Sequence, residues 1–411
     1  MASNTTVARS TPSPGPTQPR SGTRRYTVAY LDHCARASGA ELALVRMLPA
    51  LRDFEPWVIL AEEGVVVTML RERGIRVQVL PMASSTRGFS RGSVRLGPGV
   101  ARAAWGTFRY VASLARLLEQ ERPDLVATNS LKSAVYGGLA ATIVHLPVVW
   151  HLRDRVTTDY LPAAAVRLIR TLARLFPVAV IANSRTTLES LALDRGPKRA
   201  LVQTAVPSPC DLVGSGRRAR HNSDGGTFVI GMVGRLQPWK GQDVFLRAFA
   251  VAFPHGGASA VVVGGALFGE DDFERSLERL VADLGLQGRV RFTGHLDDPT
   301  SEMEGFDVLV HASVIPEPFG QVIVEGMALG LPVVACAAGG PAEIITDHVD
   351  GLLYPPGDVA ALANALRELS RDTDLRRRLG ETAARRAEAY SPTAIAPQVE
   401  AVYKQALGRH E

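Results

Sequence analysis

The sequence contains little cysteine and no paired cysteine motif. Its 411 residues include three cysteines, Cys34, Cys210 and Cys336, which are far apart and form no C-x-x-C pair. An odd, widely spaced set argues against both a disulfide framework and a zinc site. We therefore expect buried or incidental thiols and a cytoplasmic protein.

Long hydrophobic segments are also missing. No uninterrupted apolar run reaches the length of about 18 residues that suggests a membrane-spanning helix. The nearest candidate, residues 134–150, is broken by glycine, histidine and proline, which predicts a helix followed by a buried strand. Residues 1–24 are rich in Ser, Thr, Pro and Gly and lack the apolar segment of a signal peptide, so we expect a disordered tail.

Excess charge is confined to one end of the chain. The formal net charge is +5, and four arginines near the N-terminus account for most of it, which leaves the remainder near +1 (5 − 4). The sequence thus gives no support to nucleic-acid binding. Only four of the 46 basic residues are lysines, and one of these is Lys240.

Short apolar strands alternate with helices on both sides of a break at residues 207–226, where proline, serine and glycine predict a linker. This alternation predicts two α/β domains at 25–206 and 227–390, each a parallel sheet covered on both faces, followed by a C-terminal helix within 391–411. We predict strands at residues 26–31, 57–61, 75–80, 124–128, 147–150, 178–182, 228–233, 260–263, 290–293, 308–311 and 332–335. The Ser38 and Glu41 pair predicts a capping box that begins a helix, and residues 83–99 predict a long mobile loop.

The first chemical motif follows the strand at 228–233. It contains Gly234, Arg235 and Lys240, and Gly241 begins the next helix. Glycines let the backbone approach a phosphate, and a helix N-terminus adds free N–H groups beside the two cationic side chains. This combination suits a diphosphate, although a tight turn with two solvated bases is the simpler alternative.

The second motif is Glu317-Pro318-Phe319-Gly320, with Glu325 eight residues beyond Glu317. If a helix began at Pro318, the helical rise would separate the two carboxylates by roughly 12 Å along its axis, about the reach from the sugar to the ribose of a nucleotide sugar. A pair of structural carboxylates is the alternative.

Taken together, these motifs resemble glycosyltransferase family 4, whose members are retaining enzymes with the GT-B fold. Three further stretches of the second half resemble the same family in order and spacing, so that the resemblance covers roughly residues 227–390, while the first half matches only loosely. They are 284–295, Gly339-Gly340-Pro341-Ala342-Glu343 and Asp350-Gly351-Leu352-Leu353.

The resemblance implies two facing Rossmann-like domains, with the acceptor bound by the first and the nucleotide-sugar donor mainly by the second. It implies that Glu317 and His151 act at the reacting sugar and that Glu325 binds the ribose. The other donor-binding residues that it implies are Gly39, Gly234, Arg235, Lys240, Phe319, Gly320 and Gly340. A hydrogen-bonded structural histidine is the alternative for His151. At Ser38-Gly39 one glycine of the family's two-glycine loop is replaced.

The resemblance implies no metal and no cofactor, since the nucleotide sugar is a co-substrate. Asp372-Thr373-Asp374 is a D-x-D motif, but it lies between two predicted helices, where aspartate is an ordinary N-cap.

The expected function is transfer of a sugar to an acceptor hydroxyl, on a lipid-linked glycan intermediate or a natural product. Two alternatives are a sugar-nucleotide epimerase of the same fold and a non-catalytic nucleotide-sugar-binding protein. Arginines recur at 95, 102, 109 and 116 and at 167, 170 and 174. They suit either a solvated surface or peripheral contact with anionic lipid at the inner face of the membrane.

Overall fold

The computed structural model describes residues 25–83, 98–193, 202–219, 226–266 and 270–408, and for 98–104 it describes the backbone alone. The predicted tail and most of the predicted loop at 83–99 lie outside these ranges. In the described part of the chain, no helix combines the length and the apolarity that crossing a membrane needs.

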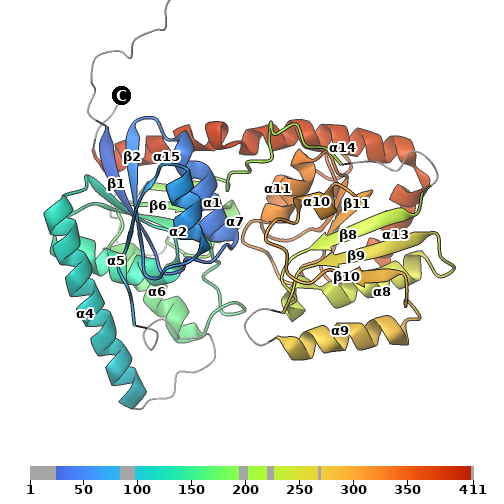
Figure 1. Ribbon diagram of the computed structural model, residues 1–411, viewed down its shortest axis with the longest axis horizontal. Coiled ribbons are helices and arrows are strands. Elements are labelled where there is room, and N and C mark those ends of the chain that lie inside the picture. Colours follow the sequence, from blue (N-terminus) through green and yellow to red (C-terminus); the bar gives the residue numbers. More distant parts are fainter. Residues whose placement is uncertain (1–24, 84–97, 194–201, 220–225, 267–269, 409–411) are drawn as a thin grey trace, which may run out of the picture.

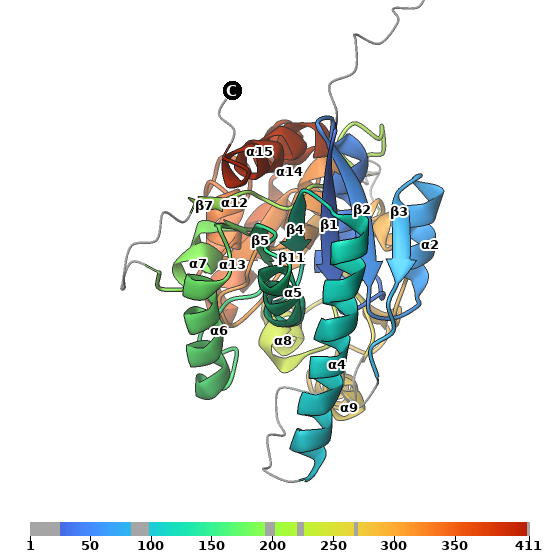
Figure 2. The ribbon, with the colours of Figure 1, turned by 90° about the vertical axis from the view of Figure 1, so that its left-hand side faces the viewer.

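The first domain is a seven-stranded parallel sheet with strand order β3-β2-β1-β4-β5-β6-β7. Its strands are β1 (Tyr26–Asp32), β2 (Phe54–Leu60), β3 (Arg76–Val79), β4 (Leu125–Thr128), β5 (Val148–Leu152), β6 (Ala179–Ala182) and β7 (Val202–Ala205). Its helices are α1 (Gly39–Met47), α2 (Val65–Glu72), α4 (Pro98–Glu121), α5 (Leu131–Ile143), α6 (Ala163–Leu175) and α7 (Arg185–Glu189). Helices α4, α5 and α6 cover one face of the sheet (Figure 2), and α1 and α2 pack on the other.

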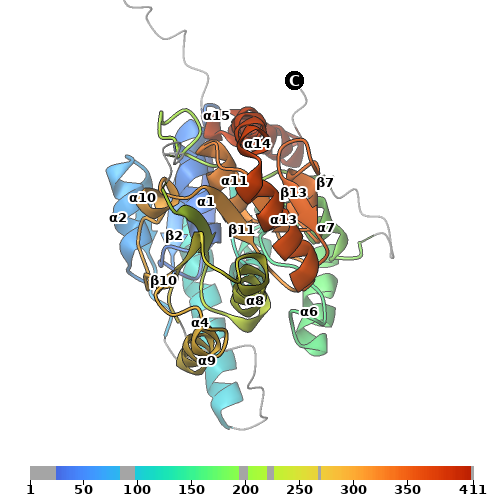
Figure 3. The same cartoon turned by 90° about the vertical axis from the view of Figure 1, so that its right-hand side faces the viewer.

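The second domain is a six-stranded parallel sheet with strand order β10-β9-β8-β11-β12-β13. Its strands are β8 (Phe228–Val233), β9 (Ala258–Val263), β10 (Val290–Phe292), β11 (Val308–His311), β12 (Val333–Cys336) and β13 (Leu352–Tyr354). The helices of this half are α8 (Gln242–Ala252), α9 (Asp271–Asp283), α10 (Thr300–Met303), α11 (Gln321–Ala328), α12 (Pro341–Ile344), α13 (Val359–Arg371) and α14 (Thr373–Ala387). Figure 3 shows this domain from its outer end.

Both sheets reverse their strand order once, between β1 and β4 in the first and between β8 and β11 in the second. In parallel sheets, ligands bind at the carboxyl ends of the strands beside such a reversal. The two domains lie side by side, and α14 continues into α15 (Pro392–Ala406) along one edge of both (Figure 1). Helix α15 packs on β5, β6 and β7 of the first domain.

The predicted fold class is confirmed, and several of the predicted elements need correction. Strands β7 and β13 were not predicted, because each is short and flanked by turn residues. Strand β5 extends through Leu152, so that His151 lies within it. Helix α11 begins at Gln321, after Gly320 with φ +103°, so Glu317 precedes the helix and the 12 Å helical-rise estimate does not apply. Ser38 is the N-cap of α1, but its hydroxyl donates to the Glu41 carboxylate instead of accepting a backbone N–H.

The arginines of α6 are only partly solvated. Arg170 donates to the carbonyls of Ser190 and Val156, and Arg174 donates to the carbonyl of Ala192. These two side chains therefore attach α6 to the loop after α7 and do not form a continuous basic surface.

Candidate functional site

The loops that follow β8 and β11 meet at the strand reversal of the second domain. After β8, a short 3₁₀ helix (Pro238–Lys240) leads to Gly241, the N-cap of α8. Gly241 has φ +75°, and a Cβ there would lie 2.0 Å from the Ala312 carbonyl oxygen just after β11. Only glycine lets the two loops pack this closely, and this packing brings Lys240 to the end of β11.

Glu317 is held by three polar groups in this corner. Lys240 Nζ lies 2.6 Å from one carboxylate oxygen of Glu317, and His311 Nε2 lies 2.8 Å from the other. The hydroxyl of Ser313 donates to that second oxygen at 2.7 Å. The side chain of Glu317 is only 12% exposed, so the carboxylate is fixed in position before any ligand binds.

The charges around Glu317 decide its protonation state. Burial alone would raise its pKa, but the positive charge of Lys240, together with His311, outweighs burial and holds the pKa of Glu317 well below its ordinary value. Glu317 is therefore a carboxylate throughout the physiological pH range and accepts hydrogen bonds only.

The glycine pair Gly339-Gly340 supports the loop that contains Glu317. The backbone N–H of Gly340 donates to the Glu317 carbonyl at 2.8 Å. Gly339 has φ +70°, and a Cβ there would lie 2.4 Å from the same carbonyl oxygen. The pair thus fixes the Glu317 backbone from the side of β12.

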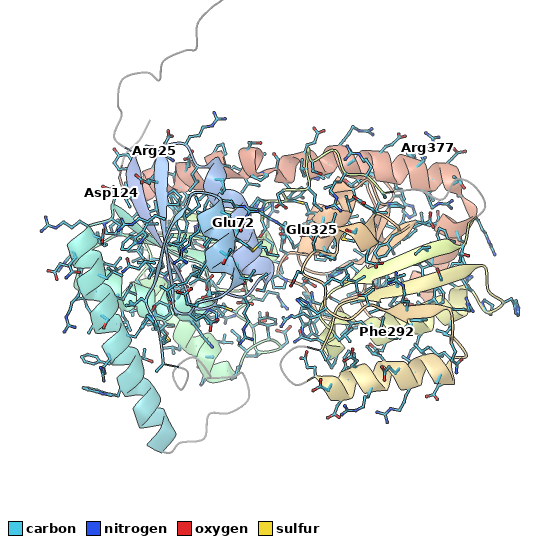
Figure 4. The ribbon with its side chains drawn as sticks, in the orientation of Figure 1. Arg25, Glu72, Asp124, Phe292, Glu325 and Arg377 are labelled. Carbon is cyan, nitrogen blue, oxygen red and sulfur yellow. The ribbon has the colours of Figure 1, made fainter. Side chains whose placement is uncertain are left out.

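Glu325 lies on α11 between the two domains, as labelled in Figure 4. Arg46 of α1 donates to one of its carboxylate oxygens at 2.8 Å. Arg46 Nε also lies 2.8 Å from Asp211 Oδ1. Burial raises the pKa of Glu325, and Arg46 only partly opposes that effect. This ion pair therefore joins the first domain to the second.

The remaining predicted donor-binding residues lie in different surroundings. Gly234 directly follows β8, and Arg235, which comes next, is half-buried. Gly39 is the exposed first residue of α1. Phe319 is buried with its ring 6.1 Å from that of Tyr390, which indicates a packing role.

His151 does not join this group. Its side chain is buried, and its Nε2 lies 2.6 Å from the hydroxyl of Tyr403 on α15. Burial, and then the charge of Arg153, hold the pKa of His151 well below its ordinary value. This environment matches the alternative of a hydrogen-bonded structural histidine.

A second polar cluster lies at the strand reversal of the first domain. His33 Nδ1 lies 3.2 Å from Asp32 Oδ1 and 2.8 Å from Ser130 Oγ, and the Asn129 amide donates to Asp32 at 2.7 Å. Arg153 donates to Asn129 at 3.2 Å. The cluster was not predicted, because its members come from three strand ends that no sequence motif connects.

Three further contacts join the domains near Glu317. Thr187 Oγ1 donates to the Pro318 carbonyl at 3.0 Å, and Arg155 donates to the Pro316 carbonyl at 3.1 Å. Glu343 of α12 accepts from the backbone N–H groups of Arg185 and Thr186 at the start of α7, at 2.8 Å each. A pocket of about 200 Å³ lies beside this contact, lined by residues of both domains, among them Asn183, Phe319 and Tyr390.

The D-x-D motif has the local role predicted for it. Asp372 is the N-cap of α14, and its side chain accepts from the Leu375 N–H at 2.8 Å.

Two partners of Glu317, His311 and Ser313, were not predicted from the sequence. Their position at the carboxyl end of a predicted strand, beside the strand that leads to Lys240, was the available signal.

Two facing Rossmann-like domains with a polar cluster at each strand reversal define the GT-B class of glycosyltransferase folds. Comparison with known families agrees. Residues 216–386 match the family described as glycosyl transferases group 1, and residues 66–205 match glycosyltransferase family 4. The crystal structure of HepE from Anabaena in complex with UDP-glucose is similar to this chain, with a TM-score of 0.78 and 30% identity over 93% of this chain and 100% of that one. The chain therefore belongs to glycosyltransferase family 4, the retaining enzymes with the GT-B fold.

Curated relatives differ in their acceptors. A D-inositol 3-phosphate glycosyltransferase of Streptomyces avermitilis is 31% identical over 312 residues, covering 70% of this chain and 66% of that protein. The lipopolysaccharide core biosynthesis glycosyltransferase LpsE of Rhizobium meliloti is 39% identical over 115 residues, covering 28% of this chain and 34% of that protein. The chain spans 24%, 44% and 34% of the length of three curated relatives that it matches.

Proposed function

We propose that this protein transfers a sugar from a UDP-sugar to an acceptor hydroxyl with retention of the anomeric configuration. The observation that carries the proposal is the buried Lys240–Glu317 pair, fixed by His311 and Ser313 at the strand reversal of the second domain. The likeness to HepE, whose structure contains UDP-glucose, supports UDP as the nucleotide.

Different residues of the second domain bind the diphosphate, the sugar and the ribose of the donor. Lys240 and Arg235 lie beside the N-terminus of α8 and neutralise the diphosphate. Glu317 accepts hydrogen bonds from the sugar hydroxyls, and Glu325 accepts them from the ribose. Negative charge grows on the diphosphate as it leaves, so fixed positive charge stabilises the transition state more than the bound donor.

The transfer step needs no nucleophile from the protein. The bond between the anomeric carbon and the diphosphate oxygen breaks, and the acceptor oxygen bonds to that carbon on the same face. The acceptor proton passes to the leaving phosphate oxygen. No water competes if the domains remain closed over the donor.

We place the acceptor on the first domain, residues 25–206, and the donor on residues 227–390. The cluster of Asp32, His33, Asn129 and Ser130 offers several hydrogen-bonding groups at the carboxyl ends of β1 and β4. Such a cluster suits a polyhydroxyl acceptor, either a glycan or a polyol. The curated relatives, which act on an inositol phosphate and in lipopolysaccharide core biosynthesis, support this class of acceptor.

The outer surface of α4 supports an acceptor that is linked to a lipid. Trp105 and Phe108 are each 62% exposed and stack with ring centroids 5.7 Å apart, and Arg109 and Arg116 share that side of the helix. In a flotation assay, the wild-type protein should rise with anionic vesicles, and the W105A/F108A variant should bind these vesicles less. A wild-type protein that stays unbound at low salt would rule out this docking.

The central experiment measures turnover with UDP-glucose and a panel of acceptors. We expect a new glycoside with the anomeric configuration of the donor, identified by NMR. The same donor incubated without acceptor tests the first alternative, because conversion into an isomeric UDP-sugar would indicate an epimerase. Tight UDP binding with no product from any acceptor of the panel would indicate a binding protein.

A further inference from the structure

The guanidinium of Arg46 forms an ion pair with Glu325, the carboxylate to which we assign the ribose of the donor. Arg46 lies in the last turn of α1, in the first domain, and Glu325 lies on α11, in the second. Their side chains are 12% and 13% exposed, and the donor and acceptor atoms are 2.8 Å apart. An ion pair at this distance and depth satisfies the carboxylate oxygen that faces the first domain.

Arg46 also has a second partner. Its Nε lies 2.8 Å from Asp211, which belongs to the segment between the two sheets and is 43% exposed. If Arg46 leaves Glu325, it can keep Asp211 and gain water. A ligand that binds Glu325 can therefore displace the guanidinium without leaving it unpaired.

We propose that Arg46 is a gate for the donor: the ribose hydroxyls replace its guanidinium on Glu325, so that nucleotide binding breaks one contact between the domains. This inference rests on the proposed role of Glu325 as the ribose site. The contacts of Thr187, Arg155 and Glu343 lie elsewhere and remain when the Arg46 contact opens.

The Arg46–Glu325 ion pair lowers the apparent affinity of the protein for the nucleotide below the intrinsic affinity of the site. Some of the binding free energy is used to separate Arg46 from Glu325, and the apparent affinity falls by the corresponding factor. A hydrogen bond between charged groups corresponds to a change of roughly tenfold or more in an equilibrium constant. Loss of the gate should therefore strengthen nucleotide binding.

The test is calorimetric titration of UDP into wild-type protein and R46Q. We expect R46Q to bind UDP about tenfold more tightly and to show a lower donor KM with an unchanged kcat. UDP whose ribose lacks both hydroxyls should show no such gain, because it does not compete for Glu325. R73Q is the matched control, since Arg73 is exposed and contacts its own helix.

Equal or weaker UDP binding by folded R46Q would overturn the gate. If R46Q does not fold, R46K replaces it in the test. The ammonium of a lysine cannot contact both Glu325 and Asp211 as the planar guanidinium does, so we expect R46K to bind UDP about threefold more tightly than wild type. E325Q in the R46Q background separates the two hypotheses, because the Arg46 ion pair is absent from both variants. If R46Q/E325Q binds UDP as R46Q does, the ribose site itself is wrong; if R46Q/E325Q binds UDP more weakly than R46Q while R46Q gives no gain over wild type, the gate alone fails.

Discussion

At the scale of the residue, Glu317 illustrates how burial and charge combine. A buried carboxylate is costly unless it is paired and hydrogen-bonded. Here Lys240, His311 and Ser313 meet that requirement and leave the carboxylate ionised. Because the same lysine is proposed to contact the diphosphate, removing it affects both the ligand and the carboxylate.

We predict that K240M lowers kcat/KM for the donor by about 100-fold or more, because the leaving diphosphate loses a fixed positive charge. Steady-state kinetics with UDP-glucose measures the effect. K404M is the matched control: Lys404 pairs with Asp53 on the surface, with side chains 30% and 53% exposed, and little change is expected. Similar losses in both variants would contradict a specific role for Lys240.

Glu41 provides a test of linkage between protonation and stability. Burial, and then the charge of Asp32, raise the pKa of Glu41 to about 8. The native state therefore keeps a proton that the unfolded state has lost, over the range from an ordinary glutamate pKa of about 4.3 up to about 8. In this window the unfolded state binds fewer protons, so the contribution of Glu41 to stability falls as pH rises.

We predict that E41Q, which mimics the protonated form, removes this decline. Relative to wild type, E41Q should gain about 3–4 kcal/mol of unfolding free energy between pH 5 and pH 9, most of it by pH 8. Urea unfolding at a series of pH values measures the difference. A constant difference across this range would mean that Glu41 is ionised in the native protein.

At the scale of the element, the turn after β12 positions the loop of the proposed donor site. We predict that G339A destabilises the protein by about 2–4 kcal/mol and reduces activity at least tenfold, because its Cβ would collide with the Glu317 backbone. Gly357 is the matched control: its φ is +75°, but a Cβ there meets nothing within 4 Å. G357A should cost only about 1–2 kcal/mol and keep full activity.

If thermal unfolding and kinetics show equal losses for G339A and G357A, backbone strain alone explains them. The steric support of Glu317 by Gly339 would then be unnecessary for activity.

Helix α15 contributes to the core of the first domain although it lies at the end of the chain. Tyr403 is fully buried, and its ring is 5.3 Å from that of Phe54 on β2. Its hydroxyl is the partner of His151. The first domain is therefore completed by residues that follow the second domain in sequence.

We predict that Y403F lowers the unfolding free energy by about 1–2 kcal/mol and changes kcat/KM by less than about threefold, because it leaves a buried histidine nitrogen without a partner. Denaturant unfolding and kinetics with UDP-glucose measure the two quantities. A large loss of activity in stable Y403F would restore a catalytic role to His151.

At the scale of the whole molecule, the domains are joined by a few polar contacts. Glu343 accepts three hydrogen bonds from the start of α7, and such contacts between charged groups and backbone N–H groups are individually modest. We predict that E343A shifts the ligand-free protein towards a more open arrangement with a larger radius of gyration in small-angle X-ray scattering. E381A removes an exposed carboxylate 3.6 Å from Arg377 and should leave the radius unchanged.

The sequence itself was sufficient to predict the fold class, and its motifs singled out Lys240 and Glu317, which the structure brings together. Continuous apolar strands between amphipathic helices predict parallel sheets, and short motifs such as Gly234-Arg235 and Glu317-Pro318 mark local turns, because both signals arise from neighbouring residues.

Only the tertiary structure decided which distant side chains meet. Lys240 meets Glu317 across 77 residues because β11 lies beside β8, and Arg46 meets Glu325 across 279 residues because the two domains face one another. His151 is buried because β5 continues past it and α15 covers it. These outcomes depend on strand order and domain packing, which are set by contacts between residues far apart in the sequence and leave no local pattern to detect.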